Sequence, residues 1–287
     1  MKVRMYNVGF GDCFCLRDRK KSLLVDFGTN NSRIEGRPRR EIFDVIISDL
    51  STIKSKNLLL THFHMDHLSG LLYMMKKKDI SVDFGKIYLP DVFSKKEMSR
   101  TLVLLLLADL LKESGLPSRQ VSLFALVDAL LENKQNVELL SRGKLFENKY
   151  QALWPDTDVI WKETDEVYNR ICEDGKFKEV MDVLLEFAEK LRLIVWSMTA
   201  EGNKPAETVE KETDLTASEL TEQPEVRQKI IRAYVYEREF RRIKALPDFK
   251  KLLAWLNENQ INLRQFKHKI SICLLYTSPS PRDISGS

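Results

Sequence analysis

The most informative part of the sequence is the run Leu58-Leu59-Leu60-Thr61-His62-Phe63-His64-Met65-Asp66-His67. Three of the four histidines in the 287-residue chain fall in this run, with an aspartate between the second and the third. The apolar residues that precede them, over 57–61, are typical of a buried strand that ends at the edge of a sheet. Imidazoles and a carboxylate at such density predict a metal site. A polar loop with incidental histidines is the alternative.

The spacing of these side chains suggests how they divide between two ions. Side chains alternate along an extended segment, so His62 and His64 are expected to face a first ion together. A helix is predicted to follow from the apolar spacing of Leu68, Leu71, Leu72 and Met75. Asp66 and His67 then lie at the N-terminus of that helix, where its dipole favours a carboxylate, and are expected to hold a second ion. These ligands suit Zn²⁺ or Mn²⁺.

Two further stretches accompany the histidines: Val8-Gly9-Phe10-Gly11-Asp12 and Leu23-Leu24-Val25-Asp26-Phe27-Gly28-Thr29. Together with His-x-His-x-Asp-His they resemble the metallo-β-lactamase-fold hydrolases, in the branch that includes the hydrolase-like domain of bacterial DNA-uptake channel proteins. The resemblance is specific over residues 1–75, thin over 85–160 and absent from the helical material beyond. It implies an α/β fold, an αββα sandwich, and two divalent ions that deliver a hydroxide to the substrate. It also implies that Asp66 accepts a proton from the attacking water.

Other candidate residues surround this motif. The resemblance places Asp12 near the metals, although an aspartate that stabilises its own turn is the alternative. Asp26 ends a strand and is expected to orient the metal loop by hydrogen bonds. Residues 30–40 read as a basic loop that could hold an anionic substrate, because arginine binds phosphate bidentately, or could be merely solvated. Its candidate residues are Arg33, Arg37, Arg39 and Arg40.

Hydrophobic patterning predicts the remaining elements. Antiparallel strands are expected over 2–8, 12–17 and 22–26, and further strands over 86–89, 146–154 and 269–276. Helices are expected over 96–113, 119–134, 164–191, 227–244 and 249–258, and an amphipathic helix is expected to contain Ile42, Phe43, Ile46, Ile47 and Leu50.

These elements suggest a domain organisation. Residues 1–160 are expected to form the first half of the hydrolase domain, with a helical insertion at about 95–142, followed by a helical segment over 161–200. Residues 201–225 hold eight acidic residues against two lysines and read as a flexible linker. Residues 226–276 would supply basic helices and the first strand of the second half.

The C-terminal residues lose all patterning. The run from Cys273 to Asp283 resembles translated sequencing-adapter read-through, so we expect 277–287 to be a non-native tail and the C-terminal half of the sandwich to be incomplete. The remaining metal ligands would then lie further on, with His268 a candidate among the residues present. Most of the inner face of the first sheet is expected to lack its cover.

Charge and cysteine usage restrict partners and location. The net charge is only +4, but residues 1–40 hold ten basic against four acidic residues, and 227–251 hold nine against three. A solvated surface or a phosphate-bearing partner such as nucleic acid explains either cluster. Four cysteines without disulfide spacing predict a reducing cytoplasm. The longest apolar run, 102–108, is too short for a membrane span.

The sequence thus predicts a metal-dependent hydrolase that acts on a phosphodiester or a nucleic-acid-like substrate. An amide, thioester or lactam would use the same metals. The alternative is a non-catalytic binding or sensing module, or an inactive fragment of the hydrolase.

Overall fold

The computed structural model describes residues 1–18, 21–77, 83–112, 122–132, 136–173, 175–200, 242–243, 245–261, 263 and 273–276. The strands are β1 (Lys2–Met5), β2 (Phe14–Asp18), β3 (Lys21–Val25), β4 (Arg33–Ile34), β5 (Arg37–Pro38), β6 (Ser55–Leu59), β7 (Ile87–Pro90), β8 (Val137–Leu140), β9 (Leu145–Phe146), β10 (Tyr150–Trp154) and β11 (Cys273–Tyr276). The helices are α1 (Arg39–Ser51), α2 (Met65–Met75), α3 (Met98–Lys112), α4 (Ser122–Glu132), α5 (Thr157–Cys172), α6 (Lys178–Ser197) and α9 (Pro247–Glu258).

The larger sheet has the strand order β1-β2-β3-β6-β7-β8. Its first three strands are antiparallel neighbours, which confirms the prediction from the sequence, and β3, β6, β7 and β8 run parallel. Parallel strands need a crossover, and α1 supplies the one between β3 and β6. The strand that precedes the histidines, β6, therefore lies inside the sheet, where Leu58 and Leu59 are fully buried.

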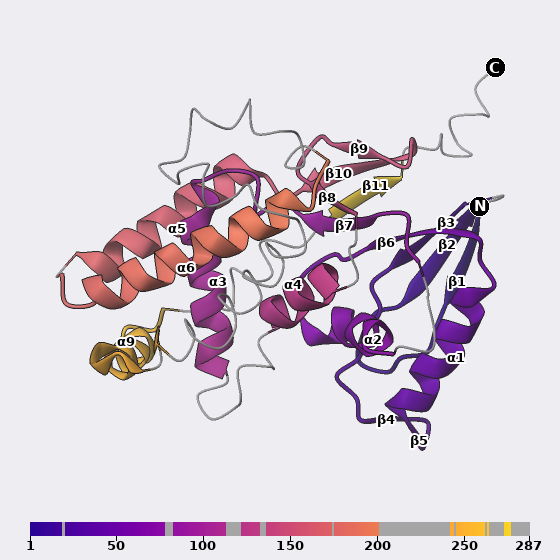
Figure 1. Ribbon diagram of the computed structural model, residues 1–287, viewed down its shortest axis with the longest axis horizontal. Helices are drawn as coiled ribbons and strands as arrows, with labels where there is room; N and C mark the ends of the chain where they lie inside the picture. Colours follow the sequence, from indigo (N-terminus) through magenta and orange to yellow (C-terminus); the bar gives the residue numbers. More distant parts are fainter. Residues whose placement is uncertain are drawn as a thin grey trace.

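Two sheets pack face to face, and helices cover the outer face of the larger one (Figure 1). Leu24 and Leu58 on that outer face belong to the core that α1 and α2 complete. Leu23 and Leu59 point to the other face and pack in one cluster with Phe146 of the second sheet, whose strand order is β11-β10-β9. The alternation of side chains along β3 and β6 thus builds both cores of an α/β sandwich.

The inner face of the larger sheet is covered unevenly. The expectation that most of it would be bare is wrong at β3, β6, β7 and β8, whose inward side chains pack against β9 and β10. At β1 the face is open, and Val3 is 57% exposed and Met5 81% exposed.

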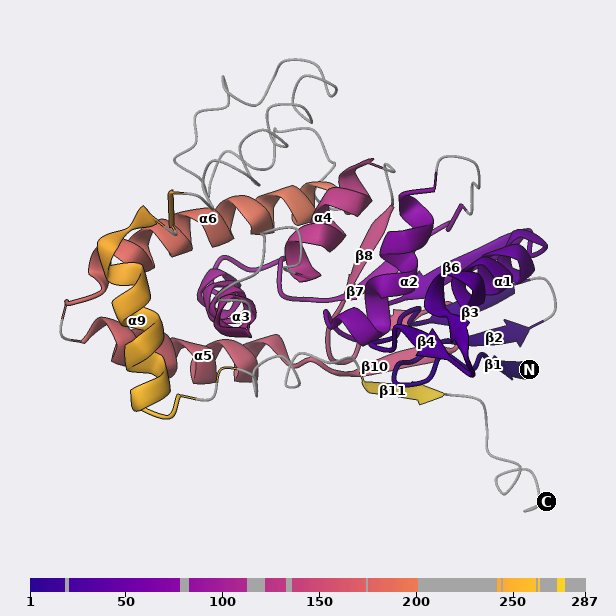
Figure 2. The same cartoon turned by 90° about the horizontal axis from the view of Figure 1, so that it is seen from below.

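The remaining described helices gather at one end of the sheets. Figure 2 shows α3 between α5 and α6, with α9 across their ends. The single helix expected over 164–191 is wrong, because α5 and α6 are separate and Gly175 between them adopts φ +64°. The helices α3, α4 and α9 confirm three of the predictions, with shifted ends. No described helix combines the length and apolarity that a membrane span requires.

Two short segments also differ from expectation. The strand expected over 146–154 is a hairpin of β9 and β10, turning at Glu147 (φ +52°) and Asn148 (φ +57°). The expected loop over 30–40 contains the β4-β5 hairpin and the first residues of α1. The linker over 201–225, the tail over 277–287 and nearly all of the helix expected over 227–244 lie outside the described residues.

Candidate metal centre

The chain leaves β6 at Leu59 and enters α2 at Met65, and the connecting residues carry the histidines. Leu60 and Phe63 anchor this connection in the core, whereas His62 and His64 are half-buried. The carbonyl of His64 accepts hydrogen bonds from the backbone N–H groups of His67, at 3.0 Å, and of Leu68, at 3.2 Å. The predicted helix start is therefore confirmed, and Asp66 and His67 occupy its first turn.

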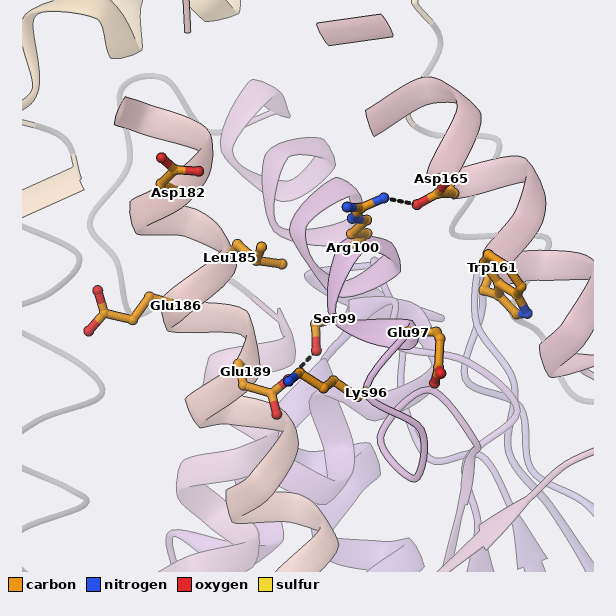
Figure 3. Close-up of a pocket in the computed structure, with 10 residues that line it drawn as sticks. All are labelled: Lys96, Glu97, Ser99, Arg100, Trp161, Asp165, Asp182, Leu185, Glu186 and Glu189. Carbon is orange, nitrogen blue, oxygen red and sulfur yellow. Dashed lines mark hydrogen bonds and ion pairs between the residues drawn. The ribbon is translucent and has the colours of Figure 1, made fainter. Parts of the chain in front are cut away.

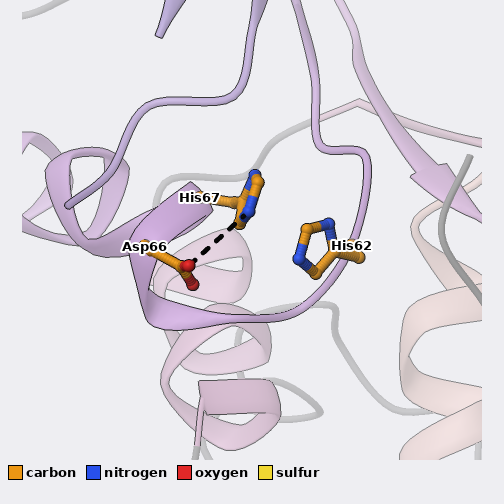
Figure 4. A group of neighbouring side chains, drawn as sticks. All are labelled: His62, Asp66 and His67. Atoms are coloured by element: carbon orange, nitrogen blue, oxygen red, sulfur yellow. Dashed lines mark ion pairs between the residues drawn. The ribbon is translucent and has the colours of Figure 1, made fainter. Parts of the chain in front are cut away.

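Three side chains form a compact group: His62, Asp66 and His67. Each offers a ligand atom, and these atoms all lie within 4.8 Å of one another. Figure 4 shows Asp66 and His67 side by side on α2, with Nε2 of His67 3.8 Å from the Asp66 carboxylate, and His62 facing them from the connection. The ring centroids of His62 and His67 are 3.6 Å apart. Two imidazoles and a carboxylate fit a divalent ion such as Zn²⁺ or Mn²⁺.

Asp26 supports this group from the end of β3. Its side chain is only 2% exposed. Its Oδ1 accepts a hydrogen bond from the Thr61 backbone N–H at 2.8 Å, and its Oδ2 accepts one from the Thr61 hydroxyl at 2.7 Å. The same Oδ2 lies 2.9 Å from Nδ1 of His67. One buried carboxylate thus contacts both ends of the segment that carries the ligands.

These contacts determine which nitrogen of each imidazole carries the proton. The Thr61 hydroxyl donates its one hydrogen bond to Asp26, so its oxygen accepts a hydrogen bond from Nδ1 of His62, 3.0 Å away. Nδ1 of His67 donates to the Asp26 carboxylate in the same way. Nε2 of both rings then keeps its lone pair, as a metal ligand must.

The charges around His67 act in opposite directions on its pKa. Burial of the ring lowers the pKa of His67, but the hydrogen bond and charge of Asp26, together with the charges of Asp66 and Asp12, outweigh this and leave it raised. A ring surrounded by three carboxylates therefore lies where a positive charge is favoured. The same carboxylates would stabilise a divalent cation bound beside the ring.

A second group of potential ligands combines Asp12, Asp26 and His67. Two of its members already bond to each other through Oδ2 and Nδ1, so this group supports the histidine. The Asp12 side chain is 58% exposed and lies 3.6 Å from Nδ1 of His67. Its backbone N–H donates to the carbonyl of Asp66 at 3.3 Å.

Glycine allows the first turn to lie against the ligand segment. A Cβ at Gly11 would stand 2.2 Å from the carbonyl oxygen of Gly28 and 2.7 Å from that of Asp66. Any side chain there would push the turn away from α2. The close approach brings Asp12 and its neighbours to the edge of the candidate site.

Comparison with family models matches residues 6–91 to the metallo-beta-lactamase superfamily. Over these residues the chain is similar to that superfamily. The match spans the turn at Asp12, the end of β3 and the whole ligand segment. Members of the superfamily commonly bind divalent metal ions. Comparisons with curated proteins and with solved structures return no match.

The other candidate residues lie at different distances from this ligand group. His64 lies outside both ligand groups, although its ring centroid is 4.7 Å from that of His62. Arg33 and Asp66 line one open hollow of about 710 Å³. Arg37 on β5 and Arg39 and Arg40 at the start of α1 are exposed and do not line it. His268 lies outside the described residues.

Sequence reasoning missed Thr61, whose hydroxyl joins Asp26 to His62. The available signal was its place, directly after the buried strand and directly before the first histidine. A hydroxyl there could have been predicted to reach the metal-binding imidazole. Asp26 was expected to orient this segment, but its pairing with Thr61 was not predicted, because the two residues are 35 positions apart in the sequence.

A second cavity, of about 650 Å³, lies between α3, α5 and α6, away from the ligand segment (Figure 3). Several of its polar side chains pair with one another. Arg100 pairs with Asp165, and the hydroxyl of Ser99 donates to Glu189. Neither ligand group found among the described residues includes a side chain from this cavity.

Proposed function

We propose that this chain is a metal-dependent hydrolase that acts on an anionic substrate of the phosphodiester class. The observation that carries the proposal is the position of Asp66, which belongs both to the ligand group and to the lining of the hollow that contains Arg33. A substrate in that hollow would meet a cationic side chain beside the candidate metal ligands. The similarity of residues 6–91 to a superfamily that is usually hydrolytic supports this proposal.

Each part of the site has a role in the proposal. His62, Asp66 and His67 would hold an ion, and His64 is a further donor beside His62 for a second. Divalent ions bound there would lower the pKa of a coordinated water and stabilise the negative charge that develops on the substrate.

The protein's own groups prepare the site. Asp26 and Thr61 hold the two imidazoles with Nε2 unprotonated, by the hydrogen bonds described above. Asp66 at the N-terminus of α2 would accept a proton from the attacking water. The guanidinium of Arg33 would bind the anionic part of the substrate, since arginine suits phosphate oxygens.

The test is hydrolysis by the chain loaded with Zn²⁺ or Mn²⁺. The substrates are bis(p-nitrophenyl) phosphate and a single-stranded oligonucleotide, compared with an amide, a thioester and a lactam. We expect turnover of the phosphodiesters that disappears in His67→Ala and in metal-free protein, and a raised KM in Arg33→Ala. Faster turnover of the neutral substrates, with an unchanged KM in Arg33→Ala, would contradict the assignment of substrate.

A binding or sensing module is the second candidate. One observation favours it over a two-ion hydrolase: the compact group of His62, Asp66 and His67 in the described residues supplies three ligand atoms, enough to hold one ion. Binding of one equivalent of metal without turnover of any of the five substrates would support the module and refute the hydrolase.

A further inference from the structure

Phe10 has an unusual position for an aromatic side chain. It is 80% exposed, although the ring is large and apolar and would gain free energy from burial. It lies in the turn between β1 and β2, between Gly9 and Gly11, and it lines the hollow that contains Asp66 and Arg33. The ring is therefore presented to solvent beside the candidate metal centre.

The backbone that carries this ring is held firmly. The N–H of Phe10 donates to Oδ1 of Asn31 at 2.9 Å, and its carbonyl accepts from the N–H of Asn30 at 2.8 Å and from the hydroxyl of Thr29 at 3.3 Å. The close approach of Gly11 to Gly28 and Asp66 secures the turn from the other side. Phe10 is thus a ring on a fixed support.

The surroundings of the ring point to one class of ligand. Asn30, Asn31 and Ser32 give the hollow polar groups, Arg33 gives it a cation, and Asp66 is the carboxylate shared with the candidate metal centre. An alkyl chain would meet one apolar ring and otherwise hydrogen-bonding groups. A flat heterocycle that carries hydrogen-bonding edges and is joined to a phosphate would match all of them, since bases stack on aromatic side chains.

Arg33 is oriented for the anionic part of such a ligand. Its Nε donates to the carbonyl of Gly36 at 3.2 Å, across the β4-β5 hairpin, and the residue is exposed. This contact uses one of the five guanidinium N–H groups. The others can pair with phosphate oxygens.

We propose that Phe10 is a stacking platform for a nucleobase next to the scissile phosphate, and that Arg33 binds the phosphate. This inference rests on the proposed hydrolase function and specifies its substrate as a nucleotide-containing phosphodiester. Phe10 would then confer preference for bases, while Arg33 would bind any phosphodiester backbone.

The experiment measures equilibrium binding by fluorescence anisotropy. Two labelled oligomers of equal length carry a hydrolysis-resistant phosphorothioate backbone, one with thymine bases and one abasic. We expect the wild-type chain to bind the base-bearing oligomer about tenfold or more tightly than the abasic one, which is the order of one stacked base. Phe10→Ala should remove this difference, and Phe10→Trp should retain it.

Matched variants separate stacking from other effects. Met5→Ala alters a side chain of similar exposure, 81%, outside the hollow and should leave both affinities unchanged. Arg33→Ala should weaken both oligomers by one factor and reduce the salt dependence of binding. The melting temperature of Phe10→Ala should equal that of wild type, because the ring is exposed.

Three results would overturn the platform: equal wild-type affinity for the two oligomers, an unchanged preference in Phe10→Ala, or an equal loss on both oligomers in that variant. The hydrolase proposal is judged separately, by metal-dependent turnover in wild type and His67→Ala. Loss of the platform would therefore leave that proposal standing, and absence of turnover would leave the base preference measurable.

Discussion

Oδ2 of Asp26 lies 2.9 Å from Nδ1 of His67 and joins the end of β3 to the first turn of α2. The same oxygen accepts a hydrogen bond from the hydroxyl of Thr61. A single buried carboxylate therefore orients the side chains of two candidate ligands, one directly and one through a hydroxyl.

Asp26→Asn should weaken metal binding by about 10- to 100-fold, because the carboxylate that orients His67 is lost. The fold should persist, since asparagine tolerates the φ of +53° at this position. The measurement is competition with a chelating dye, beside circular dichroism. Asp44→Asn on α1, whose carboxylate pairs with Lys77, is the matched control and should bind metal normally. Equal affinity in the two variants would refute the role of Asp26.

Thr61→Val should also weaken metal binding while Thr61→Ser preserves it. Valine keeps the shape of threonine but lacks the hydroxyl that lies 3.0 Å from Nδ1 of His62. Without that contact the ring is free to adopt the other tautomer. Nuclear magnetic resonance of the imidazole nitrogens reports the tautomer directly. A His62 ring protonated at Nδ1 in both variants would contradict the proposed relay.

His62→Ala should remove more bound metal than His64→Ala. His62 belongs to the compact group with Asp66 and His67, whereas His64 lies outside it, with its ring beside that of His62. Each variant should keep its helical circular dichroism, because both side chains are half-buried and the apolar strands carry the core. Metal content by elemental analysis decides between them. A greater loss of bound metal in His64→Ala would instead support the arrangement predicted from the sequence, in which His62 and His64 hold a first ion together.

Glu189 on α6 predicts a pH-dependent contribution to stability. Burial raises the pKa of its carboxyl, but hydrogen bonds from Arg192 and Ser99 outweigh this and leave the pKa lowered. A carboxyl whose pKa is depressed by folding stabilises the protein above its unfolded pKa and loses that contribution as the pH falls through the folded pKa. Glu189→Gln should therefore lower the free energy of unfolding by about 1–2 kcal/mol near neutral pH.

This difference between wild type and Glu189→Gln should shrink as the solution becomes acidic. Urea unfolding at a series of pH values from about 3 to about 7 measures it. Glu186→Gln, one turn away and paired with Lys190 at the surface, is the control and should show little effect. A difference that stays constant over this range would mean that hydrogen bonding to the charged carboxylate is not its cause.

Local patterns in the sequence were sufficient to predict many of the strands and helices of this protein. The strands β1, β2 and β3 and the apolar spacing of α1 and α2 follow from neighbouring residues, because β-branched, aromatic and apolar runs favour strands and one buried helix face imposes a period of about 3.6. The order His62, His64, Asp66, His67 after a buried strand was likewise enough to indicate metal chemistry. The breaks at Gly175 and at Glu147 and Asn148 were missed, since left-handed backbone conformations leave no trace in hydrophobic periodicity.

Only the tertiary structure decided which side chains meet. Parallel pairing of β3 with β6 brings Asp26 to Thr61 and His67, which lie 35 and 41 residues further along the chain. The packing of Gly11 against Gly28 and Asp66 places Phe10 beside the candidate metal centre, and the β4-β5 hairpin adds Arg33 while leaving Arg37 outside the hollow. Contacts of this kind depend on strand order and on close approach between distant segments, so the sequence names the donors and the fold selects among them.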